Sequence, residues 1–177
     1  QRDREDRLVL FSNKSSSVLV ATDVAARGLD IESLDLVINF YIARDSEIHT
    51  HRIGRTGRAG SAGLACSLYQ EKENYKIQVL EEYLGYPLER QELPPTSLLG
   101  STPQKPSMIT LQIDGGKKQK VRPGDILGAL TGKDGIAGSD VGKISVGIQS
   151  AYIAVKKEVG KQALAILREG KVKGRSF

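Results

Sequence analysis

The sequence predicts an α/β protein with two folded parts. In the first part, residues 1–88, short apolar segments alternate with helix-like segments, which is the pattern of a parallel sheet covered by helices. A stretch rich in proline, serine and threonine follows, so we expect a linker at residues 89–106. The second part, residues 107–177, predicts the order β-α-β-β-α-β of a small α+β domain.

The first part opens with a charged segment, residues 2–14, that we expect to be a helix ending at Asn13. Residues 18–22 place four apolar side chains before Thr22 and Asp23, which predicts a buried strand with polar groups at its carboxyl end. Ligands of open α/β sheets sit at such ends. Residues 36–40, rich in β-branched side chains, predict a second strand.

Ser46 is the expected N-cap of the next helix, with Glu47 in its first turn. Residues 63–69 predict a third strand, and we expect its Cys66 to be a buried structural residue. A single cysteine cannot form an internal disulfide, so a reducing, cytoplasmic environment fits. The helix expected at residues 71–84 carries an apolar stripe and stops at a glycine; these residues are Ile77, Leu80, Leu84 and Gly85.

In the second part, residues 108–113 alternate apolar and polar side chains, as a half-buried strand does. Pro123 predicts the first turn of a short helix that Gly132 ends. We expect two strands joined by a tight turn, at residues 143–148 and 151–156. A helix at residues 157–169, closed by Gly170, follows them, and a last strand begins at residues 171–173.

Composition excludes a membrane-spanning protein, because no apolar run approaches the roughly 20 residues that cross a bilayer. The net charge of +5 is unevenly divided: residues 1–90 hold 12 Lys and Arg against 14 Asp and Glu, whereas residues 91–177 hold 14 against 7. A basic half is the electrostatic footprint of a nucleic-acid-binding domain. A lysine-rich surface that serves only solvation is the alternative.

Residues 51–60, HRIGRTGRAG, place three arginines at a spacing of three with no acidic residue among them. A helix would turn Arg52, Arg55 and Arg58 onto one face, where their charges repel unless a polyanion binds. Guanidinium groups match phosphate oxygens bidentately. A solvated basic face is the alternative, but the intervening glycines weaken a helix and need another explanation.

These arginines and residues 18–31 (VLVATDVAARGLDI) resemble motifs VI and V of the DEAD-box RNA helicases. Residues 1–4 (QRDR) resemble the short Gln-x-x-Arg motif of that family, and residues 35–40 fit the strand between motifs V and VI. The resemblance covers the first half of the chain and implies a partial RecA-like domain with a parallel sheet. A ten-residue identity is far more specific than a lone glycine-rich loop.

A second resemblance covers residues 107–177. Residues 115–118 (GGKK), 122–132 (RPGDILGALTG), 141–144 (VGKI) and 170–174 (GKVKG) are similar to the RNA-binding domain of the DbpA-type helicases, which has an RNA-recognition-motif-like fold. In that bacterial family the domain recognises a hairpin of 23S ribosomal RNA. The resemblance therefore implies RNA as the partner and a role in assembly of the large ribosomal subunit.

The first resemblance also implies the nucleotide chemistry. Arg55 and Arg58 would reach the γ-phosphate of ATP, with Arg58 as the arginine finger, and His51 would couple this site to a partner domain. Asp30, beside Gly28, would bind the ribose hydroxyls. The sequence contains neither a G-x-x-x-x-G-K-[ST] loop nor an Asp-Glu-Ala-Asp stretch, so the Mg²⁺ ligands are expected in a missing first RecA-like domain, and no metal site is expected in this chain.

On the RNA side, the first strand of the second part has no aromatic residue, and Tyr152 is the one aromatic on the other central strand. Base stacking, the usual mode of RNA-recognition motifs, is therefore a weaker explanation than basic side chains touching a folded RNA. We expect Tyr152 to pack at the core or edge rather than to stack bases. The expected RNA contacts are Gln1, Arg4, Thr22, Lys117, Lys118, Lys120, Arg122, Lys143, Lys156, Lys171 and Lys173.

Tyr41 and Ala43 depart from the family, which usually has Asp and Pro at these places. The absent motifs, a motif IV strand missing before Gln1 and a last strand that would stop at Phe177 lead us to expect a helicase fragment cut at both ends and inactive as an ATPase alone. A non-enzymatic RNA-binding module with a scaffold RecA-like half stays open as the alternative. A nucleotide-binding regulator is disfavoured, because an arginine cluster stabilises a transition state and selects weakly among ground states.

Overall fold

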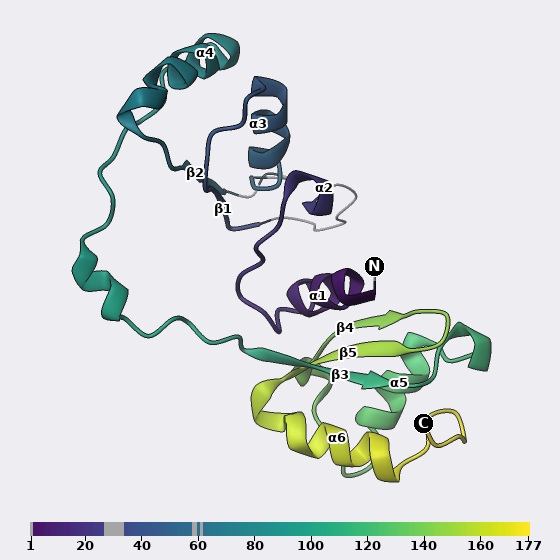
Figure 1. The fold of residues 1–177 in the computed structure, drawn as a ribbon. Coiled ribbons are helices and arrows are strands. Elements are labelled where there is room, and N and C mark those ends of the chain that lie inside the picture. Colours follow the sequence, from purple (N-terminus) through teal and green to yellow (C-terminus); the bar gives the residue numbers. More distant parts are fainter. Residues whose placement is uncertain (1, 27–33, 58–59, 61) are drawn as a thin grey trace. The chain divides into compact units, whose positions relative to one another are not determined.

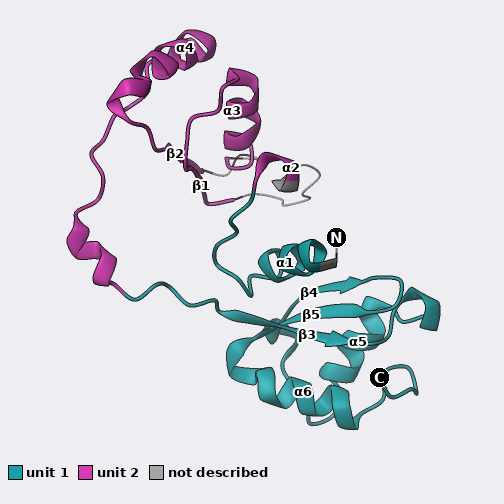
Figure 2. Cartoon of the chain, viewed as in Figure 1, with its two compact units in different colours: residues 1–21, 102–177 teal, residues 22–101 magenta. Residues whose placement is uncertain are grey.

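The computed structural model describes residues 2–26, 34–57, 60 and 62–177. The chain forms two compact units. The one called the first unit below is Thr22–Ser101 (magenta, labelled unit 2 in Figure 2), and the one called the second unit is Gln1–Ala21 with Thr102–Phe177 (teal, labelled unit 1 in Figure 2). Each unit is described by itself below. Among the described residues, no helix combines the length and the apolar character that crossing a membrane would require.

The unit Thr22–Ser101 contains a parallel pair of strands, β1 (Leu36–Asn39) and β2 (Leu64–Ser67), as the alternation of strands and helices predicts (Figure 1). Two helices follow the strands in sequence, α3 (Ser46–Ile53) after β1 and α4 (Asn74–Leu84) after β2. A short helix α2 (Asp23–Ala26) precedes them, and 3-10 turns η1 (Glu71–Glu73) and η2 (Thr96–Gly100) complete the unit.

Helices α3 and α4 pack against one another through buried side chains. Ile77 and Leu80 of α4 are buried together with Ile42, Ala43 and His49. Helix α4 ends where the sequence predicts, because Gly85 adopts the left-handed conformation (φ 78°) and its amide donates to Glu81. Full burial of one aliphatic side chain contributes about 1.5–3 kcal/mol, so this small core stabilises the helix pair.

Three expectations for the first half of the chain are wrong. Residues 18–22 form no strand, since they have no ladder partner in the described chain, and the side chains of Val18 and Val20 are exposed, Val20 at 93%. The N-cap of α3 is Asp45, whose carboxylate accepts the amide hydrogen of Glu47 at 2.7 Å, so Ser46 is the first helical residue instead. Cys66 is exposed, because the faces of the two-stranded β1-β2 sheet are largely uncovered.

The second unit is built on a three-stranded antiparallel sheet of order β3-β5-β4, with β3 at Met108–Ile113, β4 at Val141–Val146 and β5 at Ala151–Lys156. Helix α5 (Pro123–Leu130) lies between β3 and β4 in sequence, and α6 (Gly160–Glu169) follows β5. The β-α-β-β-α order agrees with the sequence prediction. Short 3-10 turns lie between these elements: η3 (Lys117–Gln119), η4 (Gly138–Asp140) and η5 (Lys157–Val159).

One face of this sheet forms the core with α5 and α6. Ile153 and Val155 of the central strand are fully buried against Ile126 and Leu130 of α5, while Leu167 of α6 completes the cluster. Alternation along β5 sends Tyr152 and Ala154 to the opposite face. The unit therefore has one apolar face that organises the fold and a second face that carries polar groups.

Helix α1 (Arg2–Ser12) and the turn after it contact that second face. The hydroxyl of Tyr152 donates to Asp6 at 3.0 Å, and the side-chain amide of Asn13 donates to Thr110 at 3.1 Å. The Lys143 ammonium donates to the Ser12 hydroxyl at 2.8 Å. Tyr152 is thus half-buried and hydrogen-bonded within its own unit.

The last strand expected from residue 171 onward is also wrong. Val172 and Arg175 exchange backbone hydrogen bonds of 2.9 and 3.1 Å across a tight turn with positive φ at Lys173 and Gly174. Val172 is buried and Phe177 packs on the core, so this segment closes the core through side chains rather than as a fourth strand of the sheet.

Candidate nucleotide and nucleic-acid interface

Arg52, on the last turn of α3, is held by a two-pronged ion pair. Its Nε donates to Oδ1 of Asp23 at 2.6 Å and its Nη2 donates to Oδ2 at 2.7 Å. A third hydrogen bond of 3.0 Å runs from Nη1 to the backbone carbonyl of Tyr41, whose ring centre lies 5.0 Å from the guanidinium carbon. The hydrogen bond to Asp23 is the largest cause that raises the pKa of Arg52. Arg52 therefore connects Asp23, which lies before β1, to Tyr41, which lies after it, and its role is structural.

Arg52 and Arg55 do not share a helical face, contrary to the expectation for residues 51–60, and Arg58 lies outside the described residues. Helix α3 ends at Ile53, where the Gly54 amide donates back to Thr50 at 2.8 Å. Arg55 follows the helix and is half-buried. Its carbonyl accepts the Leu34 amide at 3.0 Å, and Thr56 pairs with Leu34 in a parallel bridge. These bonds fix the backbone of Arg55 and Thr56 beside Leu34, two residues before β1.

His51 is exposed on the last turn of α3, two residues after the buried His49. Positions two apart on a helix point in nearly opposite directions, which explains the different exposure of the two imidazoles. Basic groups on this turn are also favoured by the helix dipole. His51 is therefore accessible to a ligand or partner, as the sequence prediction for this residue requires.

Several predicted site residues lie outside the described residues: Gln1, Gly28, Asp30 and Arg58. Thr22 is exposed directly before α2, and Arg4 is exposed on α1. Their predicted nucleotide and RNA contacts remain predictions.

In the second unit, backbone hydrogen bonds fix the turn η3, which carries two of the predicted RNA-binding lysines. Gly116 precedes this turn at a position that leaves no space for a side chain, since an added Cβ would lie 2.7 Å from backbone atoms of Gly147 and Ile148. The Lys117 amide donates to the Gly147 carbonyl at 2.9 Å and the Lys118 amide donates to the Ile148 carbonyl at 3.0 Å. These bonds hold two exposed lysines side by side on a fixed backbone.

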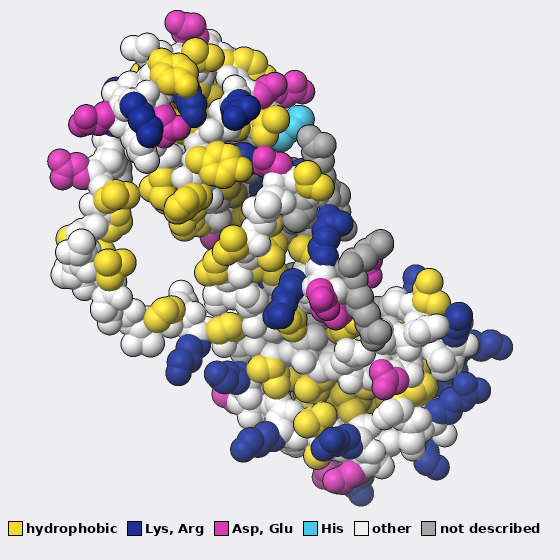
Figure 3. Space-filling view, in the orientation of Figure 1, with side chains coloured by type: hydrophobic (Ala, Val, Ile, Leu, Met, Phe, Trp, Pro, Cys, Tyr) yellow, Lys and Arg dark blue, Asp and Glu magenta, His cyan; other side chains and the backbone are white. Residues whose placement is uncertain are grey.

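The other basic residues predicted to contact RNA differ in their hydrogen bonds and ion pairs. Lys120 has positive φ (60°), and its carbonyl accepts a hydrogen bond of 3.0 Å from the Lys173 ammonium. Lys156 forms an ion pair of 2.7 Å with Asp140, whose hydrogen bond raises the pKa of the lysine. Arg122 and Lys171 are exposed. Figure 3 shows Lys and Arg side chains spread over the visible surface of this unit.

Two features of the first unit were not foreseen as site elements. The sequence left the role of Asp23 open, and its bond to Arg52 could not be deduced from residues 29 positions apart. Buried His49 was also missed. The signal that could have found it is the i, i+2 spacing of the two histidines, because such a pair on an amphipathic helix puts one ring inward.

Two protein-family models match the chain. The helicase conserved C-terminal domain matches residues 1–60, and the DbpA RNA binding domain matches residues 110–177. Among curated proteins, the chain is 51% identical over 176 residues to the ATP-dependent RNA helicase DbpA of Escherichia coli strain K12, with 99% of this chain and 38% of that protein covered. It is 34% identical over 197 residues to DbpA of Bacillus subtilis strain 168, with 100% of this chain and 41% of that protein covered.

The chain therefore spans about two fifths of the length of these relatives. A crystal structure of the E. coli DEAD-box protein SrmB, bound to regulator of ribonuclease activity A, is similar to 60% of this chain and 61% of that chain. The TM-score is 0.50 at 34% sequence identity. The similarity supports the α/β architecture of a helicase unit with a parallel sheet.

Proposed function

Because this chain belongs to the DbpA-type family of DEAD-box RNA helicases, we propose that it forms the helicase C-terminal and RNA-binding parts of an ATP-dependent RNA helicase. The observation that carries this proposal is the order of two matches on one chain, a helicase C-terminal domain followed by a DbpA RNA-binding domain. The first part supplies arginines to bound nucleotide, and the second part holds the RNA on which the helicase acts.

For the nucleotide, the donor set fits a polyphosphate. Arg55 sits on a backbone fixed by Leu34, and exposed His51 precedes it by four residues, on the last turn of α3. In the proposed mechanism Arg55 and Arg58 stabilise the charge on the γ-phosphate of ATP, His51 couples the site to a first RecA-like domain, and Asp30 beside Gly28 accepts the ribose hydroxyls. ATP supplies the phosphoryl group whose transfer to water releases free energy.

The magnesium ion belongs elsewhere in this proposal. Over residues 2–26, 34–57, 60 and 62–177 the structure contains no cluster of three or more His, Cys, Asp or Glu side chains that could hold a metal ion. We propose that the ligands of Mg²⁺ lie in a first RecA-like domain, because the sequence of this chain contains neither a G-x-x-x-x-G-K-[ST] loop nor an Asp-Glu-Ala-Asp stretch.

For the RNA, we assign the main contact to the lysine pair of η3, since hydrogen bonds to Gly147 and Ile148 fix its backbone and its two side chains are exposed. We place additional phosphate contacts at other basic side chains of the same unit: Lys120, Arg122, Lys143, Lys156, Lys171 and Lys173. The proposed target is a hairpin of 23S ribosomal RNA, and the proposed role is assembly of the large ribosomal subunit in the cytoplasm. Gln1, Arg4 and Thr22 would contact the RNA backbone from the helicase part.

RNA-stimulated ATP hydrolysis by the protein that contains this chain and both RecA-like domains tests the enzymatic part. Arg58→Ala should lower kcat by about 10³-fold, the contribution typical of an arginine finger, while RNA affinity changes little. Turnover within about twofold of the unaltered protein would contradict the assignment. It would favour the alternative of an RNA-binding module whose RecA-like half is a scaffold.

Binding of the 177-residue chain to a 23S ribosomal RNA hairpin tests the RNA surface. The double variant Lys117→Ala, Lys118→Ala should flatten the dependence of log affinity on log salt by about 1.4–1.8, which corresponds to two lost phosphate contacts. The exposed pair Lys133→Ala, Lys161→Ala is the matched control, with the same loss of charge away from η3. Equal effects of the two double variants would refute the placement of the surface.

A further inference from the structure

Residues 2–15, which are helix α1 and the turn after it, bond to the face of the β3-β5-β4 sheet that points away from the core; we call them the α1 cover (Figure 1). At β3, the side-chain amide of Asn13 donates to the Thr110 hydroxyl at 3.1 Å, and the hydroxyls of Ser15 and Thr110 lie 2.7 Å apart. Ala154 of the central strand points to the same face and is only 1% exposed. This face of the sheet is therefore closed rather than open to solvent.

On the other two strands, the α1 cover engages groups that suit RNA. The Tyr152 hydroxyl of β5 donates to the Asp6 carboxylate at 3.0 Å, and the Lys143 ammonium of β4 donates to the Ser12 hydroxyl at 2.8 Å. Aromatic rings on the central strands of RNA-recognition motifs stack on bases. A phosphate oxygen accepts hydrogen bonds from a hydroxyl or an ammonium group, and the bond from an ammonium is stronger to a phosphate than to a neutral hydroxyl. RNA and the α1 cover therefore compete for the same donors.

The docked position of the α1 cover also has two costs. Asn13 is 2% exposed, and within the described part of the chain its side-chain oxygen has no hydrogen-bond partner. A buried acceptor without a partner destabilises the arrangement that buries it. Lys14 has φ 56°, a left-handed conformation that is unfavourable for residues other than glycine. Release of the α1 cover removes both costs, so its docking is only partly compensated by the bonds that it makes.

We propose that the α1 cover is an autoinhibitory contact that closes a second RNA-binding surface. In the released state, Tyr152 stacks on a base of single-stranded RNA, Lys143 binds a neighbouring phosphate, and the Thr110 hydroxyl bonds to a base edge. The proposal rests on the RNA-binding function proposed above and adds to it a surface separate from the lysine pair of η3. Single-stranded RNA binds this surface only in the fraction of molecules whose α1 cover is released, which lowers its apparent affinity.

Binding of fluorescent octauridylate to the 177-residue chain, followed by anisotropy, tests the proposal. Thr110→Val keeps the β-branched shape of the side chain and removes its two bonds to the α1 cover, so the apparent affinity should rise about tenfold. Thr131→Val is the matched control, because that hydroxyl donates to the Leu127 carbonyl at the end of α5, and it should change affinity less than about twofold. Equal affinities of the two variants would overturn the proposal.

Two substitutions of Tyr152 separate loosening of the α1 cover from stacking. Tyr152→Phe removes the bond to Asp6 and keeps the ring, so octauridylate should bind about three- to tenfold more tightly. Tyr152→Leu also removes the bond but leaves no ring, and it should bind no more tightly than the unaltered chain. Equal gains in the two variants would refute the stacking role of Tyr152.

Amide hydrogen exchange observes the α1 cover directly. Saturating octauridylate should accelerate exchange in α1 of the unaltered chain, and Thr110→Val should do so without RNA, while exchange in β5 stays slow in both cases. RNA that leaves exchange in α1 unchanged, or slows it, would overturn the proposal. Binding of the 23S ribosomal RNA hairpin is measured alongside: if the hairpin binds and Thr110→Val gains nothing with octauridylate, the autoinhibitory contact alone is refuted. If neither RNA binds any variant, the RNA-binding function is refuted with it.

Discussion

The ion pair between Asp23 and Arg52 should be a main stabilising contact of the unit Thr22–Ser101. The conservative variant Asp23→Asn keeps the shape of the side chain but removes the charge, and its amide NH₂ faces one of the two guanidinium donors. Two hydrogen bonds of 2.6 and 2.7 Å are affected. Hydrogen bonds to charged groups contribute about 1.5–3 kcal/mol each, and solvent screening reduces this at a carboxylate that is 35% exposed.

We therefore expect Asp23→Asn to lower the free energy of unfolding of this unit by about 2 kcal/mol, a factor of about 30 in the unfolding equilibrium. Five of the six tyrosines lie in this unit and tryptophan is absent, so tyrosine fluorescence reports on it during urea unfolding of the whole chain. The midpoint should fall by about 1–2 M urea, given the small slope typical of so short a unit.

Glu82→Gln is the matched control, since it removes one negative charge from an exposed position of α4. Its midpoint should shift by less than about 0.3 M, the effect usual for surface substitutions. Arg52→Lys should lose most of the stabilisation, because an ammonium cannot form the two-pronged pair. Equal midpoints for Asp23→Asn and Glu82→Gln would show that the pair contributes nothing and that the link between the two segments is not structural.

Three further predictions follow from other residues. Burial holds the pKa of His49 below its ordinary value of about 6.5, so below that pH the unfolded chain binds more protons than the folded chain. The free energy of unfolding should therefore be constant above pH 7 and decrease by at most about 1.4 kcal/mol per pH unit below 6.5. Urea titrations at several pH values measure this slope, and His49→Gln should remove it. Gly116→Ala forces its Cβ against the backbone of the β4-β5 turn and should cost about 1–3 kcal/mol and accelerate amide exchange at η3; Gly138→Ala, where the space is open, should do neither. Exposed Cys66 should react with a thiol reagent in the native chain at a rate close to that in urea, and strong protection would contradict its exposure.

Local patterns predicted the elements whose own residues decide the conformation. The apolar stripe of α4 and its stop at Gly85 are confirmed, as are β3, the proline at the start of α5 and the paired strands β4 and β5. In each case spacing, β-branching or a glycine supplies the preference locally. The strand at residues 18–22 failed because a strand also needs a neighbour to receive its backbone hydrogen bonds, and a run of apolar residues does not specify one.

The arginine segment illustrates the same limit at the candidate site. Its residue types indicated phosphate chemistry, yet the helix ends at Ile53, and Arg52 turns to Asp23 rather than toward a shared arginine cluster. Pairing over 29 positions depends on how α2 and α3 approach one another, and no spacing in the sequence encodes that distance. The spacing of the two histidines could indicate that one ring faces inward, but not that it is His49, since burial of a polar residue depends on what packs over it.

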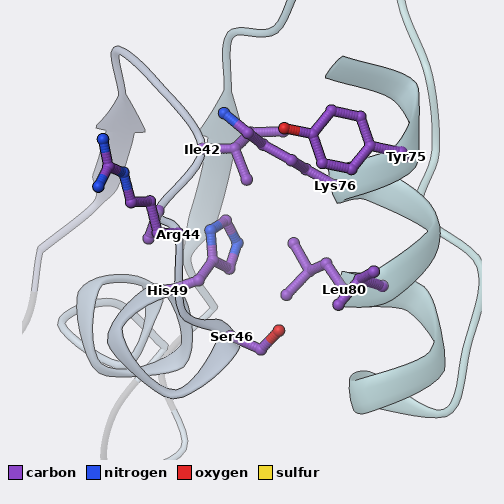
Figure 4. A pocket seen from close by; sticks show the side chains of 9 residues that line it. Ile42, Arg44, Ser46, His49, Tyr75, Lys76 and Leu80 are labelled. Carbon is purple, nitrogen blue, oxygen red and sulfur yellow. The ribbon is translucent and has the colours of Figure 1, made fainter.

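The sequence alone determined the family and the order of its two parts, because motif identity and hydrophobic period are properties of neighbouring residues. Only the tertiary structure decided three other points. Arg52 is held in an ion pair, Lys117 and Lys118 lie on a turn with a fixed backbone, and His49 rather than His51 faces a cavity between α3 and α4 (Figure 4). Electrostatic and hydrogen-bond energies depend on distance and burial in space, and these quantities appear only when segments remote along the chain have packed together.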